Sequence, residues 1–156
     1  MSTIYLVRHA KAGSRGEWKG PDRARPLTEK GRRQAKAIAK MLEGLPIEHI
    51  LTSEYTRCWE TVAPLAKKLG VLVEEAPALA EGSRLSEVLD LFNALGEGVS
   101  VLCTHGDVIG DVLTHLATSG IDIGDDPRLE KGSIWILERD RDTFTSARYV
   151  PPPDGI

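Results

Sequence analysis

Residues 3–9 read Thr-Ile-Tyr-Leu-Val-Arg-His, and residues 99–106 read Val-Ser-Val-Leu-Cys-Thr-His-Gly. Each stretch is a short apolar, β-prone run that leads to a histidine, His9 in the first and His105 in the second. In open α/β sheets, ligands bind beyond the carboxyl ends of the strands. Strands that run in the same direction would bring both histidines to one pocket, although either histidine alone is more often a packed structural residue.

The apolar side chains between and after these stretches recur at helical spacing and predict four helices. Thr28 is a suitable N-cap for the first helix, which Gly44 and Pro46 end, and Gly70 is a suitable C-cap for the second. Pro64 lies inside the second helix and predicts a kink there. The four apolar faces comprise Ala35, Ile38, Ala39 and Leu42; Trp59, Val62, Ala63, Ala66 and Leu69; Leu85, Val88, Leu89 and Phe92; and Ile109, Val112, Leu113 and Leu116.

Further short β-prone runs alternate with these helices. They are residues 49–51, an edge strand at 71–73, and an antiparallel pair at 133–137 and 145–150. Strands that alternate with helices indicate an α/β fold. We therefore expect a three-layer sandwich with a mostly parallel central sheet and helices on both faces. A single domain should cover residues 1–156, of which 151–156 form an extended, exposed tail.

The overall composition narrows the class of protein. The 156 residues include 20 Lys or Arg and 23 Asp or Glu, so the net charge is −3 and the pI is near 5.8. This balance argues against nucleic-acid and membrane-surface partners. No apolar run approaches the roughly 20 residues of a membrane span, and the first residues do not resemble a signal peptide. With Cys58 and Cys103 expected to be reduced, packed thiols, we expect a cytoplasmic protein.

The charge is unevenly distributed along the chain. Residues 8–36 carry ten Lys or Arg and three Asp or Glu, a local net charge of +7, and the remaining residues sum to −10. Within this stretch, residues 10–27 show no periodicity and predict a long loop, which in a compact domain is often functional. Some of the basic side chains, such as Arg32, Arg33 and Lys36, can simply face solvent. The remaining positive charge would attract a phosphate.

Arg57 follows another strand end, Leu51-Thr52-Ser53, at a distance of about one helical turn. Taken alone, an arginine in this position is more often a solvated surface residue. The alternative is that Arg57 directs a second guanidinium, beside that of Arg8, into the pocket of the two histidines.

Four motifs now stand in order along the chain. They are Leu6-Val7-Arg8-His9-Ala10; Pro26-Leu27-Thr28-Glu29-Lys30-Gly31 with Gln34-Ala35; Thr52-Ser53 leading to Arg57; and Thr104-His105-Gly106. Together they resemble the histidine phosphatase, or phosphoglycerate-mutase-like, superfamily. The short chain and the Arg-His-Ala form look most like its small branch, which contains the SixA-type protein phosphohistidine phosphatases. The chain also looks like the phosphatase domain attached to some bacterial Nudix hydrolases.

The resemblance implies a phosphoglycerate-mutase-like fold and a role for each motif residue. His9 would be the nucleophile that forms a phosphohistidine, with one ring nitrogen unprotonated and the other held by a hydrogen-bond acceptor. Arg8 and Arg57 would bind the equatorial phosphate oxygens, and His105 would donate a further hydrogen bond. Such fixed donors stabilise the charge that the transition state spreads over three oxygens. Neither a metal nor a cofactor is required.

A leaving alkoxide also needs a proton, which members of the family that cleave stable esters take from a carboxylic acid. Glu81, in Ala78-Leu79-Ala80-Glu81-Gly82, stands at the matching place, and Glu75 and Glu87 are weaker alternatives. Glu81 could instead be a surface carboxylate at a helix start. Some SixA-type enzymes lack the acid, because a phosphohistidine leaves readily without one. Glu81 therefore bears directly on the class of substrate.

Three functions are compatible with this resemblance. The one that the resemblance favours is a SixA-like protein phosphohistidine phosphatase, and the alternative is a phosphatase of small molecules such as nucleotides or sugar phosphates. The third is a phosphate-binding regulatory module without turnover. The partner would be a phosphohistidine protein or a phosphorylated small molecule. The chain lacks the long insertions that cap the larger mutases, so we expect an open pocket and not a dedicated mutase.

Two other phosphatase mechanisms fit poorly. A cysteine-dependent phosphatase needs an arginine six positions after its cysteine, but the count from Cys103 reaches Ile109 and the count from Cys58 reaches Pro64. A metallohydrolase needs clustered ligands. Asp111 and His115 are one helical turn apart, but such a pair is far more often a surface contact.

Overall fold

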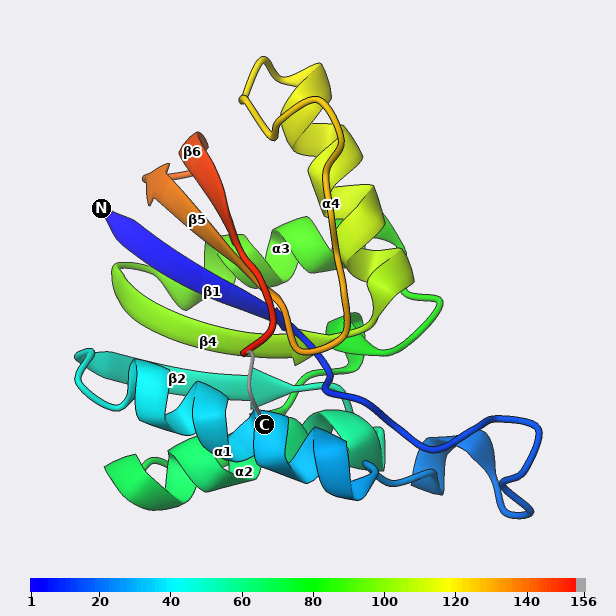
Figure 1. The fold of residues 1–156 in the computed structure, drawn as a ribbon. Helices are drawn as coiled ribbons and strands as arrows, with labels where there is room; N and C mark the ends of the chain where they lie inside the picture. Colours follow the sequence, from blue (N-terminus) through cyan, green and yellow to red (C-terminus); the bar gives the residue numbers. More distant parts are fainter. Residues whose placement is uncertain (154–156) are drawn as a thin grey trace.

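A six-stranded sheet forms the centre of the molecule in a computed structural model that describes residues 1–153 (Figure 1). The strands are β1 (Ser2–Arg8), β2 (Ile47–Thr52), β3 (Val73–Glu75), β4 (Gly98–Thr104), β5 (Ile134–Asp140) and β6 (Thr143–Val150). Their order across the sheet is β3-β2-β4-β1-β5-β6. The first four strands are mutually parallel, whereas β5 and β6 add an antiparallel hairpin at one edge.

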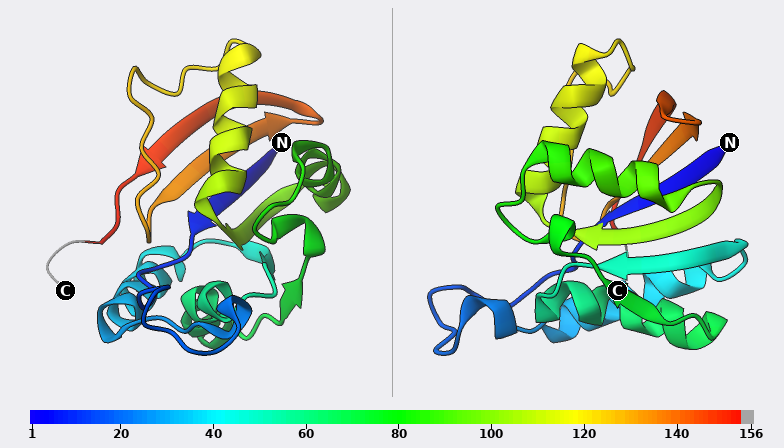
Figure 2. Two further views of the ribbon diagram at one scale, coloured as in Figure 1. Left: turned by 90° about the vertical axis from the view of Figure 1, so that its right-hand side faces the viewer. Right: turned by 180° about the vertical axis from the view of Figure 1, so that it is seen from behind.

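Four helices cover the two faces of this sheet. They are α1 (Glu29–Leu42), α2 (Thr56–Leu69), α3 (Leu85–Leu95) and α4 (Gly106–Thr118). The side chains of β1 alternate between two apolar cores: Leu6 packs with residues of α3 and α4, and Val7 packs with residues of α1 and α2. Figure 2 shows α1 and α2 on one side of the sheet and α3 and α4 on the other. The expected three-layer α/β sandwich with a mostly parallel sheet is confirmed.

The register of the central strands brings three carboxyl ends to the same edge. Val7 of β1 and Thr52 of β2 both pair with Cys103 of β4, and Arg8 pairs with Thr104. The chain therefore leaves β1, β2 and β4 at about the same height along the sheet. This shared register positions the site described below.

Several local expectations are confirmed at the helix ends. The hydroxyl of Thr28 caps α1 by accepting from the backbone N–H of Gly31 at 3.0 Å. Gly70 ends α2 in the left-handed conformation, with φ of 67°. Short 3₁₀ turns lie at Asp22–Ala24 and Pro77–Leu79. The loop over residues 10–27 contains the first of these turns and an isolated bridge between Ala12 and Leu27.

The predicted apolar face of α2 is wrong in part. Ala63 is exposed, and the buried stripe is Arg57, Cys58, Thr61, Val62, Leu65 and Ala66. The helix is turned so that polar residues of its first two turns face inward, which a search for apolar periodicity does not detect. Pro64 lies within a single unbroken helix, and the edge strand occupies Val73–Glu75 instead of residues 71–73.

Pro151 is exposed, whereas Pro152 and Pro153 are half-buried, so the expected exposure holds only for the first residue of the tail. The rest of the predicted tail, residues 154–156, lies outside the described residues. Within residues 1–153, no helix is long and apolar enough to cross a lipid bilayer.

Candidate active site

A cavity of about 390 Å³ opens at the edge of the sheet where β1, β2 and β4 end. Its lining includes all five predicted site residues: Arg8, His9, Arg57, Glu81 and His105. Arg8 is the last residue of β1, His105 lies between β4 and α4, and Arg57 belongs to the first turn of α2. The pocket is therefore assembled from segments that are far apart in the sequence and meet because of the parallel register.

The His9 imidazole is buried, with 5% of the residue exposed, and its orientation is fixed. Its Nδ1 lies 2.9 Å from the carbonyl oxygen of Ala10. Because a carbonyl oxygen only accepts, Nδ1 carries the proton and Nε2 keeps its lone pair. Burial, together with the positive fields of His105, Arg57 and Arg8, lowers the pKa of His9 to about 3. His9 is therefore a neutral imidazole at neutral pH with a lone pair available at Nε2.

His105 faces His9 at an edge-to-face ring distance of 5.5 Å. Its Nε2 lies 2.9 Å from the hydroxyl of Ser53 and 3.6 Å from the thiol sulfur of Cys58, and the Tyr55 ring packs on it at 4.7 Å. Among the described residues, nothing bonds to the buried Nδ1 of His105. A ligand in the pocket would supply the partner that a buried imidazole nitrogen lacks.

Arg8 lies against the start of α4. Its Nη1 donates to the backbone carbonyl of Leu129 at 2.6 Å, while its buried Nε has no partner within residues 1–153. A Cβ atom on Gly106 would come within 2.9 Å of the guanidinium carbon, so a larger residue there would require the Arg8 side chain to shift. Desolvation lowers the pKa of Arg8, and the nearby Asp107 carboxylate opposes that shift.

Arg57 is the most deeply buried cation of the pocket, with 1% of the residue exposed. Its Nη1 donates to the backbone carbonyl of Asp22 at 2.9 Å, and its Nη2 reaches the carboxylates of Asp22 at 3.2 Å and Glu81 at 3.3 Å. The guanidinium also lies over the Tyr55 ring at 4.8 Å. The alternative of a solvated surface arginine is thereby excluded.

Comparison with known proteins agrees with this geometry. A sequence model of the histidine phosphatase superfamily (branch 1) matches residues 4–84, more than half of the chain. The chain belongs to the histidine phosphatase superfamily.

Known proteins that resemble this histidine phosphatase superfamily member in sequence or in fold differ in what they act on. An 8-oxo-(d)GTP phosphatase of Mycolicibacterium smegmatis is 32% identical over 97% of the chain, which spans 49% of that relative's length. The protein histidine phosphatase SixA complexed with tungstate superposes with a TM-score of 0.77 at 22% identity, over 93% of this chain and 95% of that one. A mycobacterial glucosyl-3-phosphoglycerate phosphatase superposes with a TM-score of 0.71 at 18% identity, over 96% and 97% of the two chains. The two structural likenesses concern the fold.

Glu81 lies at the mouth of the pocket of this superfamily member, with 35% of its side chain exposed. One carboxylate oxygen contacts Arg57 and the other contacts Arg15, each at 3.3 Å. The two alternative carboxylates have other partners: Glu75 accepts from the Trp59 indole N–H at 2.6 Å. Glu87 accepts from the backbone N–H at the start of α3. Of the three candidate carboxylates, Glu81 is the one that lines the pocket.

Sequence reasoning missed three residues that support the site. The Asp22 carboxylate forms ion pairs with both Arg57 and Arg25. Desolvation alone would raise the pKa of Asp22, but the positive charges of these arginines outweigh it and the pKa is lowered. Thr61 accepts from the backbone N–H of Ala10 at 2.9 Å and donates to the carbonyl of Arg57 at 2.7 Å. Lys131 reaches the pocket from the loop before β5. The sequence signal for Asp22 is its position as an acidic residue within the strongly basic stretch of residues 8–36.

The possibility that Asp111 and His115 bind a metal ion gains no support from the structure. Asp111 and His115 lie on α4 away from the residues that line the pocket, and His115 borders a separate hollow near Arg139. Across residues 1–153, no three His, Cys, Asp or Glu side chains are grouped in a way that could hold a metal ion.

Proposed function

We propose that the chain is a phosphatase that takes the phosphoryl group of its substrate onto His9 without using a metal ion. The observation that carries this proposal is the neutral His9 imidazole, whose Nδ1 is bound to Ala10 and whose pKa is about 3. Arg8, Arg57 and His105 line the same cavity and are suited to bind the three equatorial oxygens. In-line attack would form the Nε2–P bond while the bond from phosphorus to the leaving oxygen breaks.

The electron pair of the broken bond passes to the leaving oxygen. An alkoxide would take a proton from Glu81, whereas a phosphate leaving group would depart as a stable anion. Water would then attack the phosphohistidine and lose a proton to the Glu81 carboxylate as the N–P bond breaks. These steps would release inorganic phosphate and return His9 to its neutral state.

For the substrate, we favour a phosphorylated small molecule. Glu81 lies in the pocket, where an acid helps the cleavage of stable esters but is unnecessary for a phosphohistidine. The M. smegmatis relative, which matches 97% of the chain, is an 8-oxo-(d)GTP phosphatase. A SixA-like protein phosphohistidine phosphatase is the second candidate, which the fold shared with SixA and the open pocket support.

Hydrolysis of p-nitrophenyl phosphate by wild type and His9→Ala tests the reaction. We expect turnover in excess EDTA by the wild type and a loss of at least about 1,000-fold in His9→Ala, because the covalent route disappears. His115→Ala, which removes an imidazole outside the pocket, is the matched control and should keep wild-type activity. Equal activity of His9→Ala and wild type would disprove the nucleophile, activity lost in EDTA would restore a metal mechanism, and an inactive wild type would favour a binding module.

A substrate panel with Glu81→Gln separates the two substrate classes. If Glu81 is the acid and the substrate is an ester, Glu81→Gln should slow hydrolysis of sugar phosphates and nucleoside monophosphates by about 100-fold or more. Hydrolysis of a phosphohistidine peptide should change little. Equal effects on both classes would remove the acid role, and a wild type active on phosphohistidine peptides alone would establish the second candidate.

A further inference from the structure

The candidate pocket holds more positive charge than a single phosphoryl group needs. Five basic residues line it, namely Arg8, Arg15, Arg25, Arg57 and Lys131, against the two carboxylates Glu81 and Asp107. Arg8 and Arg57 are the cations that the proposed reaction assigns to the transferred phosphoryl group. The other three must be explained in another way.

Two of these three cations are already balanced by protein groups. Arg25 is buried and donates to the Asp22 carboxylate at 3.0 Å and to the carbonyl of Gly13 at 2.5 Å. Arg15 reaches the Asp22 carboxylate at 3.4 Å and that of Glu81 at 3.3 Å. Both arginines therefore have structural partners in the ligand-free pocket.

Lys131 differs from these arginines. In the part of the chain that the structure describes, its ammonium forms no ion pair and no hydrogen bond, and the adjacent Glu130 pairs with Arg128 instead. Partial desolvation and the charges of Arg8, Arg25, Arg57 and Lys11 lower the pKa of Lys131. A ligand that brings negative charge to this unpaired ammonium would relieve its repulsion by the nearby cations.

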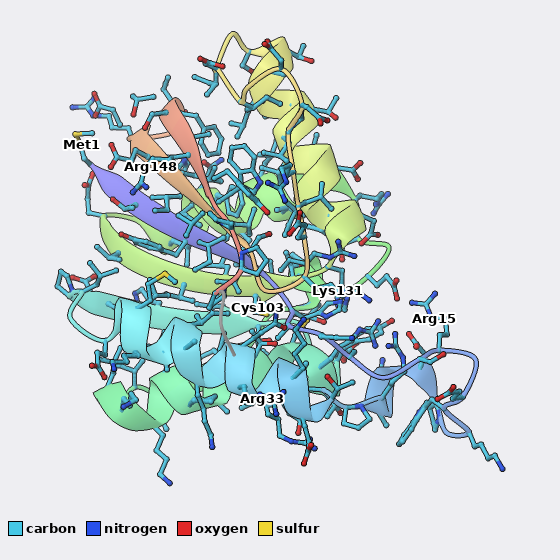
Figure 3. The ribbon with its side chains drawn as sticks, in the orientation of Figure 1. Met1, Arg15, Arg33, Cys103, Lys131 and Arg148 are labelled. Carbon is cyan, nitrogen blue, oxygen red and sulfur yellow. The ribbon has the colours of Figure 1, made fainter. Side chains whose placement is uncertain are left out.

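The backbone around Lys131 is fastened to the end of β1. The N–H of Gly132 donates to the carbonyls of Arg8 and His9, both at 3.1 Å, and the N–H of Arg8 donates to the carbonyl of Ser133 at 3.0 Å. On the other side, Arg8 also holds the carbonyl of Leu129. Lys131 is therefore held beside the reactive residues from both sides, and Figure 3 shows it on the side of the molecule where the loop that bears Arg15 also lies.

The direction of the reaction indicates which part of a substrate Lys131 would meet. His9 is buried in the pocket, and in-line attack expels the leaving group on the opposite side of the phosphorus. Lys131 lines the same pocket but is exposed, so it lies closer than His9 to the solvent-facing mouth toward which a leaving group would project. The transferred phosphoryl group has its own donors in Arg8, Arg57 and His105.

We propose that Lys131 binds a second phosphate of the leaving group and so makes the enzyme selective for substrates with adjacent phosphates, such as nucleoside di- and triphosphates. This inference rests on the proposed function for the identity of the transferred group. It adds a specificity residue to the site and assigns the leaving group to the phosphate class. Such a leaving group departs as an anion, so for these substrates Glu81 would serve mainly as the base that takes a proton from water in the second step.

Binding of simple anions tests the proposal without any turnover. Calorimetric titration of His9→Ala protein with inorganic tripolyphosphate and with orthophosphate gives the affinity for an extended and for a single phosphate. Introducing Lys131→Met into the His9→Ala protein should weaken tripolyphosphate binding about tenfold, as expected for the loss of one charge-assisted hydrogen bond at a partly exposed site. The affinity for orthophosphate should change by less than about threefold. Lys131→Arg should retain most of the preference.

Lys40→Met, which removes an equal charge from an exposed position at the end of α1, is the matched control and should alter neither affinity. Equal weakening of both anions by Lys131→Met, no weakening of either, or the same effect from Lys40→Met would overturn the proposal. Because the titration needs no catalysis, these outcomes are independent of whether His9 is the nucleophile. In the enzyme with His9 intact, Lys131→Met should weaken inhibition of p-nitrophenyl phosphate hydrolysis by tripolyphosphate and leave inhibition by orthophosphate nearly unchanged.

Discussion

The His9 side chain combines burial with a ring nitrogen that keeps its lone pair. Burial removes the proton from the imidazole, and the carbonyl of Ala10 then fixes which nitrogen keeps the remaining one. The arginines that would bind a phosphate also help to keep His9 neutral, since their charge disfavours an imidazolium. One arrangement of charges would thus serve both the proposed nucleophile and a bound anion.

This arrangement predicts a specific pH dependence of stability. In the unfolded chain, His9 takes up a proton near the ordinary pKa of 6.5, whereas in the folded protein it does so only near pH 3. The free energy of unfolding should therefore fall as the pH is lowered from 6.5 toward 3, by at most about 1.4 kcal/mol per pH unit from this residue. Urea denaturation of His9→Gln at pH 4 to 7 should show a shallower decline than wild type. His49→Gln is the control for loss of an imidazole outside the pocket, and an unchanged slope in His9→Gln would contradict the assignment.

The residues that sequence reasoning could place are those whose backbone position alone determines where they lie. Arg8, His9 and His105 follow directly from two strand ends, and their meeting requires only that the strands be parallel. Thr61 and Lys131 are different, because each reaches the site from a segment whose orientation depends on tertiary packing. A threonine inside a helix carries no local sign that it will bind the backbone of Ala10.

At the scale of elements, the site depends on how α4 begins beside the end of β1. The pairing of Arg8 with Thr104 places the Arg8 side chain next to the first turn of α4, which starts two residues later at Gly106. The periodic apolar residues predicted all four helices and most strands, because burial of one face determines those elements. The same periodicity misassigned the buried face of α2, because Arg57 and Thr61 are buried there and make polar contacts at the pocket.

We expect Gly106→Ala to damage the site without unfolding the protein. The new Cβ would approach the guanidinium carbon of Arg8 to 2.9 Å, so the side chain of Arg8 must shift from its present position in the pocket. The value of kcat/KM for p-nitrophenyl phosphate should fall about tenfold or more, as is usual when one clamping group is displaced. Gly110→Ala on the same helix is the matched control, because nothing lies within 4 Å of its Cβ and activity should persist. Full activity of Gly106→Ala would show that the position of Arg8 is not critical.

At the scale of the whole molecule, three of the ten basic residues within 8–36 line the pocket, namely Arg8, Arg15 and Arg25. The other seven are exposed outside the pocket lining, and Arg32, Arg33 and Lys36 are among those on α1. The net charge of −3 therefore conceals a pocket whose lining is positively charged. Such a field attracts anionic substrates.

The division of charge predicts which arginines govern the salt dependence of activity. Raising the ionic strength from 0.01 to 0.15 M shortens the screening length from about 30 Å to about 8 Å and should lower kcat/KM for p-nitrophenyl phosphate several-fold, with little change in kcat. Arg15→Gln, at the mouth of the pocket, should flatten this dependence, because less of the attractive field is left to be screened. The double variant Arg32→Gln with Arg33→Gln removes more charge but from the exposed surface of α1, and should keep the wild-type dependence. If the double variant flattens the salt dependence as much as Arg15→Gln does, the field arises from the basic stretch as a whole and not from the pocket.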